Sequence, residues 1–132
     1  KLMVSGAHDE TVRVWDFQTS DELLNLEEHK AEIKCLQYEG NMLVTGSADK
    51  TAKLWNIDAG KCLATLPHRK DVKSLCLVYS ENLVFTSSET SVFAWDLRTH
   101  RQVKTFNEHG AAVTGIQYNK HNNQLISSCM GG

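Results

Sequence analysis

The chain has 132 residues, enough for about one ordinary domain, and its apolar fraction of 41% with a charged fraction of 23% is typical of a globular protein. The net charge of -2 and the isoelectric point near 6.3 argue against binding to nucleic acid or to an anionic membrane surface. No apolar run approaches the roughly 18 residues that a membrane span needs, and four cysteines without a Cys-x-x-Cys pair favour free thiols in an intracellular compartment, cytoplasmic or nuclear.

A tryptophan recurs on a fixed pitch of 40 residues, as Trp15, Trp55 and Trp95. The segment MVSGAHDETVRVWD at 3–16 aligns without a gap on LVTGSADKTAKLWN at 43–56. The third copy, LVFTSSETSVFAWD at 83–96, fits best when its strand starts one residue later and its turn is one residue shorter. Self-similarity at this period predicts a repeat architecture.

Each unit reads as four short strands, which the second unit shows most clearly: residues 32–38, 42–47, 51–56 and 61–66, separated by turns rich in Gly, Asn and Asp. Residues 20–29 have some helical character, but their register copy at 61–68 is strand-like, so we expect a strand there too. We therefore predict an all-β fold with 13 strands between Leu2 and Ser128.

The strands are apolar on both faces, as the runs LMV, MLV and LVF show. Sheets that are covered on both sides by other sheets need that pattern. Four-stranded antiparallel sheets repeated radially form the blades of a β-propeller.

At this point the residues resemble a known family, the WD40-repeat β-propellers, over essentially the whole chain. The family's Trp-Asp signature stands at Trp15-Asp16, at Trp95-Asp96 and, as the variant Trp-Asn, at Trp55-Asn56. Its Gly-His signature survives as the histidine alone, at His29, His68 and His109.

The resemblance implies that one His, one Ser or Thr, one Asp and the Trp form a hydrogen-bonded chain inside each blade. A buried indole N–H needs such a partner. The second blade has the full set: His29, Thr45, Asp49 and Trp55. The other blades have partial sets: Ser5, Asp9 and Trp15 in the first; His68, Thr86 and Trp95 in the third, with Glu89 at the Asp position; and His109 with Ser127 in the fourth. A half-satisfied network costs stability, so we expect the third blade to be the weakest.

We place the blades at 1–27, 31–67, 71–107 and 111–132, within a single domain spanning 1–132 and with the first and last blades incomplete. Thirteen strands make about three and a quarter blades, whereas a closed propeller needs roughly four to eight. We therefore expect an incomplete ring that is a fragment of a longer propeller, seven-bladed by family resemblance. The isolated chain should aggregate or fold poorly because its cut edges are unpaired.

No catalytic motif is present: the chain lacks a Gly-x-Ser-x-Gly elbow, a phosphate-binding loop and a His-Glu-x-x-His helix. We therefore expect no enzymatic activity and no cofactor. A metal site built from the three repeated histidines is the rival interpretation, but one per blade cannot converge to the roughly 2 Å that zinc ligands require.

Binding residues are a better target. By family resemblance the top face of a propeller is lined by residues beside the first apolar residue of each inner strand and just before the turn Asp. The first set is Glu32, Lys34, Asp71, Lys73, Ala112 and Thr114, and the second is His8, Ala48 and Ser88. The acid-base pairs are either solvated surface charge or a mixed-charge rim that selects a polar peptide or protein.

Two classes of function follow. The first is a rigid protein-interaction scaffold that assembles a multiprotein complex. The second is the substrate receptor of an F-box/WD40-type ubiquitin ligase, whose tight inner hairpins resemble those at 35–47 and 74–85. Such receptors bind phosphate through arginines, whereas this chain has Lys34 and Lys73 at the matching positions. A cytoskeletal or microtubule-associated scaffold is a further alternative.

Overall fold

The computed structural model describes residues 2–6, 9–107, 113–119 and 124–129, without the side chains of 114, 124, 125 and 127–129. Every sheet is antiparallel and built from strands that follow one another in the chain. The first sheet has three strands: β1 (Leu2–Gly6), β2 (Val12–Asp16) and β3 (Glu22–Leu26). The second has four: β4 (Ile33–Glu39), β5 (Met42–Ser47), β6 (Thr51–Asn56) and β7 (Lys61–Pro67).

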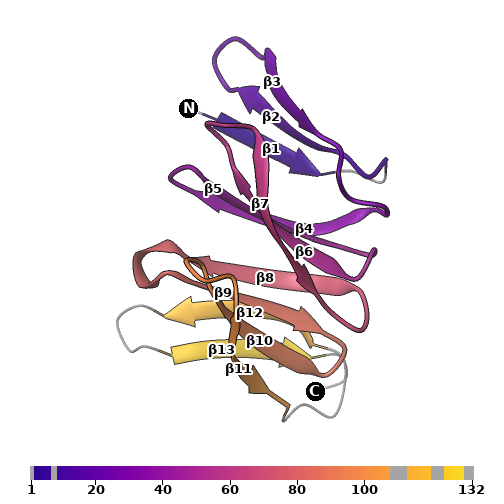
Figure 1. Ribbon diagram of the computed structural model, residues 1–132, viewed down its shortest axis with the longest axis vertical. Helices are drawn as coiled ribbons and strands as arrows, with labels where there is room; N and C mark the ends of the chain where they lie inside the picture. Colours follow the sequence, from indigo (N-terminus) through magenta and orange to yellow (C-terminus); the bar gives the residue numbers. More distant parts are fainter. Residues whose placement is uncertain (1, 7–8, 108–112, 120–123, 130–132) are drawn as a thin grey trace.

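The third sheet also has four strands: β8 (Val72–Val78), β9 (Leu83–Ser88), β10 (Ser91–Asp96) and β11 (Gln102–Phe106). A short 3-10 turn, η1 (Tyr79–Glu81), joins its first two strands. The last sheet pairs β12 (Val113–Asn119) with β13 (Gln124–Cys129). The first, second and third sheets follow one another from top to bottom in Figure 1, and the last sheet overlaps the third in this view and contacts it through β12.

The predicted all-β fold is confirmed, and so is the shorter third turn. Three residues separate β5 from β6, whereas two, Glu89 and Thr90, separate β9 from β10. The ambiguous segment 20–29 contains the strand β3 rather than a helix. No helix in the described part of the chain has the length and apolar character needed to cross a bilayer.

The repeat extends to the irregularities of the sheets. The pairing of each tryptophan strand with its outer neighbour shifts register just before Trp15, Trp55 and Trp95. The inner strands β4, β8 and β12 each shift two residues after their first apolar side chain. Since a bulge re-aims the side chains beside it, this repeated pattern gives the sheets the same shape.

The second and third sheets contribute to the hydrophobic core on both of their faces, whereas the first and last sheets each share one cluster. On β5, Leu43 packs toward the first sheet in a cluster with Val12 and Trp55, whereas Val44 packs toward the third sheet in a cluster with Val72 and Trp95. A third cluster around Phe85, Val92 and Val113 joins the third sheet to the last. This double burial is the reason for the uninterrupted apolar runs in the sequence.

Neighbouring sheets approach closely at a glycine that recurs in the repeat as Gly6 and Gly46. A Cβ added to Gly46 would lie 2.5 Å from the Cys35 sulfur and 2.7 Å from Cγ1 of Val72. The Gln37 side chain on β4 also bridges to β8: its Oε1 accepts from Leu77 N at 2.9 Å and its Nε2 donates to Leu77 O at 3.4 Å. These contacts hold the second and third sheets in a fixed orientation.

Candidate protein-interaction face

A continuous series of hydrogen bonds, which we call the relay, runs through the second sheet and joins Trp55, Thr45, His29 and Asp49. The indole Nε1 of Trp55 on β6 donates to the hydroxyl of Thr45 on β5, 2.9 Å away. That hydroxyl lies 2.6 Å from Nε2 of His29, and Nδ1 of His29 lies 2.8 Å from the carboxylate of Asp49 in the β5–β6 turn. Four residues that are separated in the sequence thereby link the core of the sheet to its upper turn.

The donors and acceptors of this chain have a fixed direction. An indole N–H can only donate and an ionised carboxylate can only accept. We assign His29 as a neutral imidazole that donates from Nδ1 to Asp49 and accepts at Nε2 from Thr45, because this arrangement also uses the hydroxyl hydrogen of Thr45. Burial lowers the pKa of His29 despite the opposing effect of Asp49. Burial alone would raise the pKa of Asp49, but its hydrogen bonds from Thr51, Lys30 and His29 hold it at about 2.

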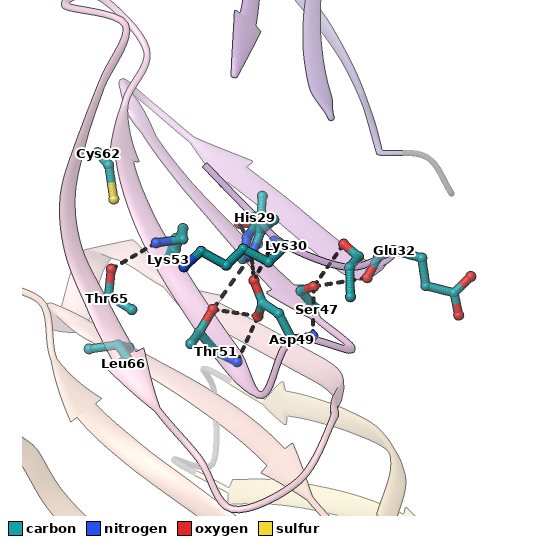
Figure 2. Close-up of polar contacts among 12 residues, drawn as sticks. His29, Lys30, Glu32, Ser47, Asp49, Thr51, Lys53, Cys62, Thr65 and Leu66 are labelled. Atoms are coloured by element: carbon teal, nitrogen blue, oxygen red, sulfur yellow. Dashed lines mark hydrogen bonds and ion pairs between the residues drawn. The ribbon is translucent and has the colours of Figure 1, made fainter. Parts of the chain in front are cut away.

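Asp49 also organises the turn and the loop beside it, as Figure 2 shows. Its carboxylate accepts from the hydroxyl of Thr51 at 2.6 Å, from Thr51 N at 2.9 Å and from Lys30 N at 3.0 Å. The Ser47 hydroxyl donates to the carbonyl of Glu32 at 2.9 Å, and Ala48 N donates to the same carbonyl at 3.0 Å. Asp49, through Lys30, and its neighbours Ser47 and Ala48, through Glu32, thus tie the loop before β4 to the β5–β6 turn.

The third sheet keeps most of this relay. Trp95 donates to the Thr86 hydroxyl at 2.9 Å, and that hydroxyl lies 2.7 Å from Nε2 of His68. Glu89, which stands at the Asp position, adopts a left-handed conformation with φ of 53°. Instead Nδ1 of His68 donates to the main-chain carbonyl of Leu66 at 3.0 Å. The carboxylate is missing, as the sequence indicates, but the ring still has two partners.

The outer sheets show less of the pattern. In the first sheet, Trp15 donates to the Ser5 hydroxyl at 3.1 Å. Asp9 accepts from the main chain and the hydroxyl of Thr11 at 3.2 and 2.6 Å, and pairs with Arg13 at 3.5 Å. In the last sheet, His109 lies outside the described residues, as does the side chain of Ser127.

The predicted binding residues meet at one end of the sheets, which we call the top face: it comprises the β5–β6 and β9–β10 turns and the loops leading into β4 and β8. Within it we call Glu32, Lys34, Asp71 and Lys73 the mixed-charge rim. Lys34 pairs with Glu32 at 2.6 Å. This ion pair raises the Lys34 pKa, and the charge of Asp71 in the next sheet adds to the effect. Acids from two neighbouring sheets therefore both favour the charged form of Lys34.

The rest of the predicted binding set is less concentrated. Lys73 is exposed and, with Asp71, lines a hollow of about 250 Å³. Ala48 is half-buried, and Ser88 is buried with its hydroxyl bonded to the carbonyl of Lys70 at 3.0 Å. Three further predicted residues cannot be placed, because His8, Ala112 and the side chain of Thr114 lie outside the description.

Sequence reasoning missed two residues that line the hollow, Lys70 and Glu89, and one that supports the relay, Thr51. A signal for the last was present. Asp9 with Thr11 and Asp49 with Thr51 share the spacing Asp-x-Thr, and in both places the Asp carboxylate accepts from the threonine main chain and hydroxyl. This spacing is typical of an Asx turn.

By residue type, the described histidines and cysteines could also act as metal ligands and as nucleophiles. In the described part of the chain, no group of three or more His, Cys, Asp or Glu is placed to hold a metal ion. Both ring nitrogens of His29 and of His68 are engaged within their relays. Burial raises the pKa of the Cys35 thiol to about 12 and also raises those of Cys62 and Cys76, which lowers their nucleophilicity.

Two of the similar proteins match most of this chain, and a third matches a shorter stretch of it. It is 24% identical over 126 residues to meiotic fizzy-related protein 1 of Schizosaccharomyces pombe, covering 93% of this chain and 30% of that protein. It is 29% identical over 161 residues to CCR4-associated factor 4 of Saccharomyces cerevisiae, covering 89% of this chain and 25% of that protein. A 41-residue stretch is 51% identical to mitochondrial division protein 1 of Aspergillus clavatus, covering 31% of this chain and 6% of that protein.

The chain thus spans less than a third of the length of each of these relatives. The WD40 family (WD domain, G-beta repeat) matches four successive segments: 1–16, 20–56, 60–96 and 100–132. Domains of this family are in general non-catalytic scaffolds that bind other proteins. Because the first three matched segments end at Asp16, Asn56 and Asp96, directly after the three tryptophans, and because the sheets repeat with them, the chain belongs to the WD40 repeat family.

Proposed function

We propose that the top face of this chain is the platform on which the protein assembles a multiprotein complex, and that the mixed-charge rim selects a polar protein or peptide. The observation that carries the proposal is the link between relay and rim. The hydrogen-bonded chain from Trp55 to Asp49 reaches the loop of Glu32 through Lys30 N, and separate bonds from Ala48 N and the Ser47 hydroxyl to the Glu32 carbonyl hold that loop against the same turn. A surface fixed in this way loses little conformational entropy when a partner binds.

The charges of the rim favour a partner that carries both signs. Lys34 lies among carboxylates, while Lys73 and the neighbouring Lys70 are exposed. Complementary charges at an interface rim act mainly on specificity and on the rate of association. The family relatives support the general role, since one is named as a factor associated with another protein, CCR4. The three described cysteines are free thiols, which supports an intracellular location.

The phosphodegron alternative receives less support from this geometry. A phosphate would have to displace or join the carboxylates around Lys34, and Glu32 already lies 2.6 Å from its ammonium group. Calorimetry with phosphopeptides on the full-length protein tests this alternative, using the double variant Lys34→Ala and Lys73→Ala. Tight binding that the double variant abolishes would favour the degron receptor over the scaffold.

The proposal itself is tested by removing the rim and comparing it with a matched control. The rim variant carries Glu32→Ala, Lys34→Ala, Asp71→Ala and Lys73→Ala. The control carries Asp58→Ala, Lys61→Ala, Glu81→Ala and Arg98→Ala, which also removes two acids and two bases but at exposed positions of the opposite turns.

Both variants are made in the full-length protein, and co-purifying proteins are measured by quantitative mass spectrometry. We expect specific partners to be lost from the rim variant and retained by the control. Identical partner sets for wild type and rim variant would contradict the proposal. Tubulin among the proteins lost would favour the cytoskeletal form of the scaffold.

A further inference from the structure

The third sheet differs from the second at its upper end, beside His68. Two residues, Glu89 and Thr90, replace the three-residue turn that contains Asp49 in the second sheet. The shorter turn places no carboxylate against the imidazole, and a pocket of about 580 Å³ opens there. The loop after β7, the turn after β9 and the outer strand β11 form its walls.

The pocket is lined by residues at the positions that surround Asp49 in the second sheet. There, Asp49 accepts from the main chain of Lys30 and from the hydroxyl of Thr51. Arg69 and Ser91 occupy the same two repeat positions in the third sheet, and both line the pocket. Two of the positions that donate to Asp49 are therefore repeated at a place where the chain supplies no carboxylate of its own, whereas the third donor, Nδ1 of the histidine, is turned to the Leu66 carbonyl.

The donors in this pocket suit an anionic oxygen. Arg69 is exposed and forms no ion pair among the described residues, so its guanidinium is available for a bidentate contact. The Ser91 hydroxyl donates to the side-chain oxygen of Asn107, an exposed partner that it can exchange for a ligand. Thr105 accepts from Gln102 and keeps its own hydroxyl hydrogen for donation.

The floor of the pocket suits an aliphatic stem. Phe93 stands where the second sheet has Lys53, whose ammonium group donates to Thr65 at 2.9 Å. The Phe93 ring packs edge-on against His68 with centroids 5.3 Å apart. Exchange of a long cationic side chain for a ring therefore leaves an apolar surface below the donors, and a volume of this size falls in the range of pockets that hold small ligands.

We propose that this pocket binds the side chain of an aspartate or glutamate from a partner peptide, with its carboxylate in the place that Asp49 occupies in the second sheet. Glu89 is the one acid lining the pocket. It is exposed and also lines the hollow that contains Lys70 and Lys73, so cations flank it on that side. The site lies outside the mixed-charge rim, and the inference goes beyond the function proposed for the rim.

The indole N–H groups provide a direct test, because Trp95 is linked to His68 through Thr86 while Trp55 belongs to a relay that already contains a carboxylate. The full-length protein is labelled with ¹⁵N-tryptophan and titrated with N-acetylaspartate N-methylamide, and the neutral asparagine analogue is the matched control. The indole signals are assigned with Trp95→Phe and Trp55→Phe. We expect a saturable shift of the Trp95 signal with the acidic probe and none with the neutral one.

Two variants separate the pocket from the rim. Arg69→Gln should weaken binding of the acidic probe by about tenfold or more, as the loss of a charge-assisted contact implies. Lys34→Ala in the rim should leave the affinity for the probe unchanged, because Lys34 pairs with Glu32 and does not line the pocket. Replacing Glu89-Thr90 by the second sheet's Ala-Asp-Lys should abolish probe binding, because an internal carboxylate then fills the pocket. No saturable shift, an equal response to the neutral probe, or an equal shift of Trp55 would overturn the proposal, even if the rim binds its partners.

Discussion

Asp49→Ala should destabilise the protein by roughly 2.5–6 kcal/mol, although it removes only one small side chain at a turn. The carboxylate receives four hydrogen bonds between 2.6 and 3.0 Å long, from His29, Lys30 and two atoms of Thr51. The His29 side chain is 0% exposed, so its Nδ1–H would be left without a partner in a place that water cannot easily reach. An unsatisfied buried donor costs about 1–3 kcal/mol, and the more accessible turn bonds add about 0.5–1 kcal/mol each.

Equilibrium urea unfolding of the full-length protein measures this change through tryptophan fluorescence and circular dichroism, with the denaturant slope checked for constancy. Asp49→Asn should cost less, because the amide oxygen can still accept from His29 while the amide nitrogen faces donors. Glu89→Gln, at the matching position of the third sheet, is the control and should stay within about 0.5 kcal/mol, since Glu89 is exposed. If Asp49→Ala costs no more than Glu89→Gln, the account of the relay is wrong.

Three further outcomes are expected from the same unfolding experiment. Trp55→Ala should lower the free energy of unfolding by roughly 3–5 kcal/mol, as large-to-small core changes do. Trp15→Ala should lower it distinctly less, because Trp15 is only half-buried whereas Trp55 is 1% exposed. Equal losses would contradict the packing described. The free energy of unfolding should decrease as the pH falls below the usual histidine pKa of 6.5. Burial lowers the pKa values of His29 and His68, so the unfolded chain then binds protons that the folded chain does not. A urea midpoint that stays constant between pH 8 and 5 would exclude this linkage. Gly46→Ala should destabilise by about 1–3 kcal/mol through overpacking between two sheets, and a neutral result would mean that the sheets can move apart.

The fold was largely predictable because local and repeated signals agree. The tryptophan pitch, the turn residues and the two-sided apolar runs each indicate stacked antiparallel sheets, and the gap needed to align Glu89 predicted the shorter turn that the structure contains. Self-similarity also decided the segment 20–29, which has some local helical character but no sustained helical period. The strand β3 shows that packing between sheets outweighs local helical propensity there.

One partner of His68, Thr86, was predicted from the sequence, but the other could not be predicted, because it is a main-chain carbonyl. Residue types identify side-chain acceptors such as Asp49, but any residue in the position of Leu66 offers the same oxygen. The absence of an aspartate therefore does not leave the imidazole unsatisfied. That the third blade is the weakest stays a prediction, which now depends on the pocket beside His68 rather than on a broken relay.

The arrangement of charges in the rim could not be predicted from the sequence either. The acid-base pairs were visible as Glu32 with Lys34 and Asp71 with Lys73, but the influence of Asp71 on Lys34 depends on how two sheets are placed side by side. Spacing along one strand carries no information on that placement. The geometry distinguishes the two lysines, since Lys34 is paired at 2.6 Å and Lys73 is exposed.

The most direct test of the proposed interaction face is hydrogen exchange of the full-length protein, alone and in complex with the proteins that co-purify with it. The account predicts that exchange slows in segments 30–34, 47–50 and 69–73, which form the top face. Segments 57–60 and 79–82, in the turns at the opposite end of the sheets, should exchange at the same rate in both samples. Protection of those opposite turns, with the top-face segments unchanged, would contradict the account.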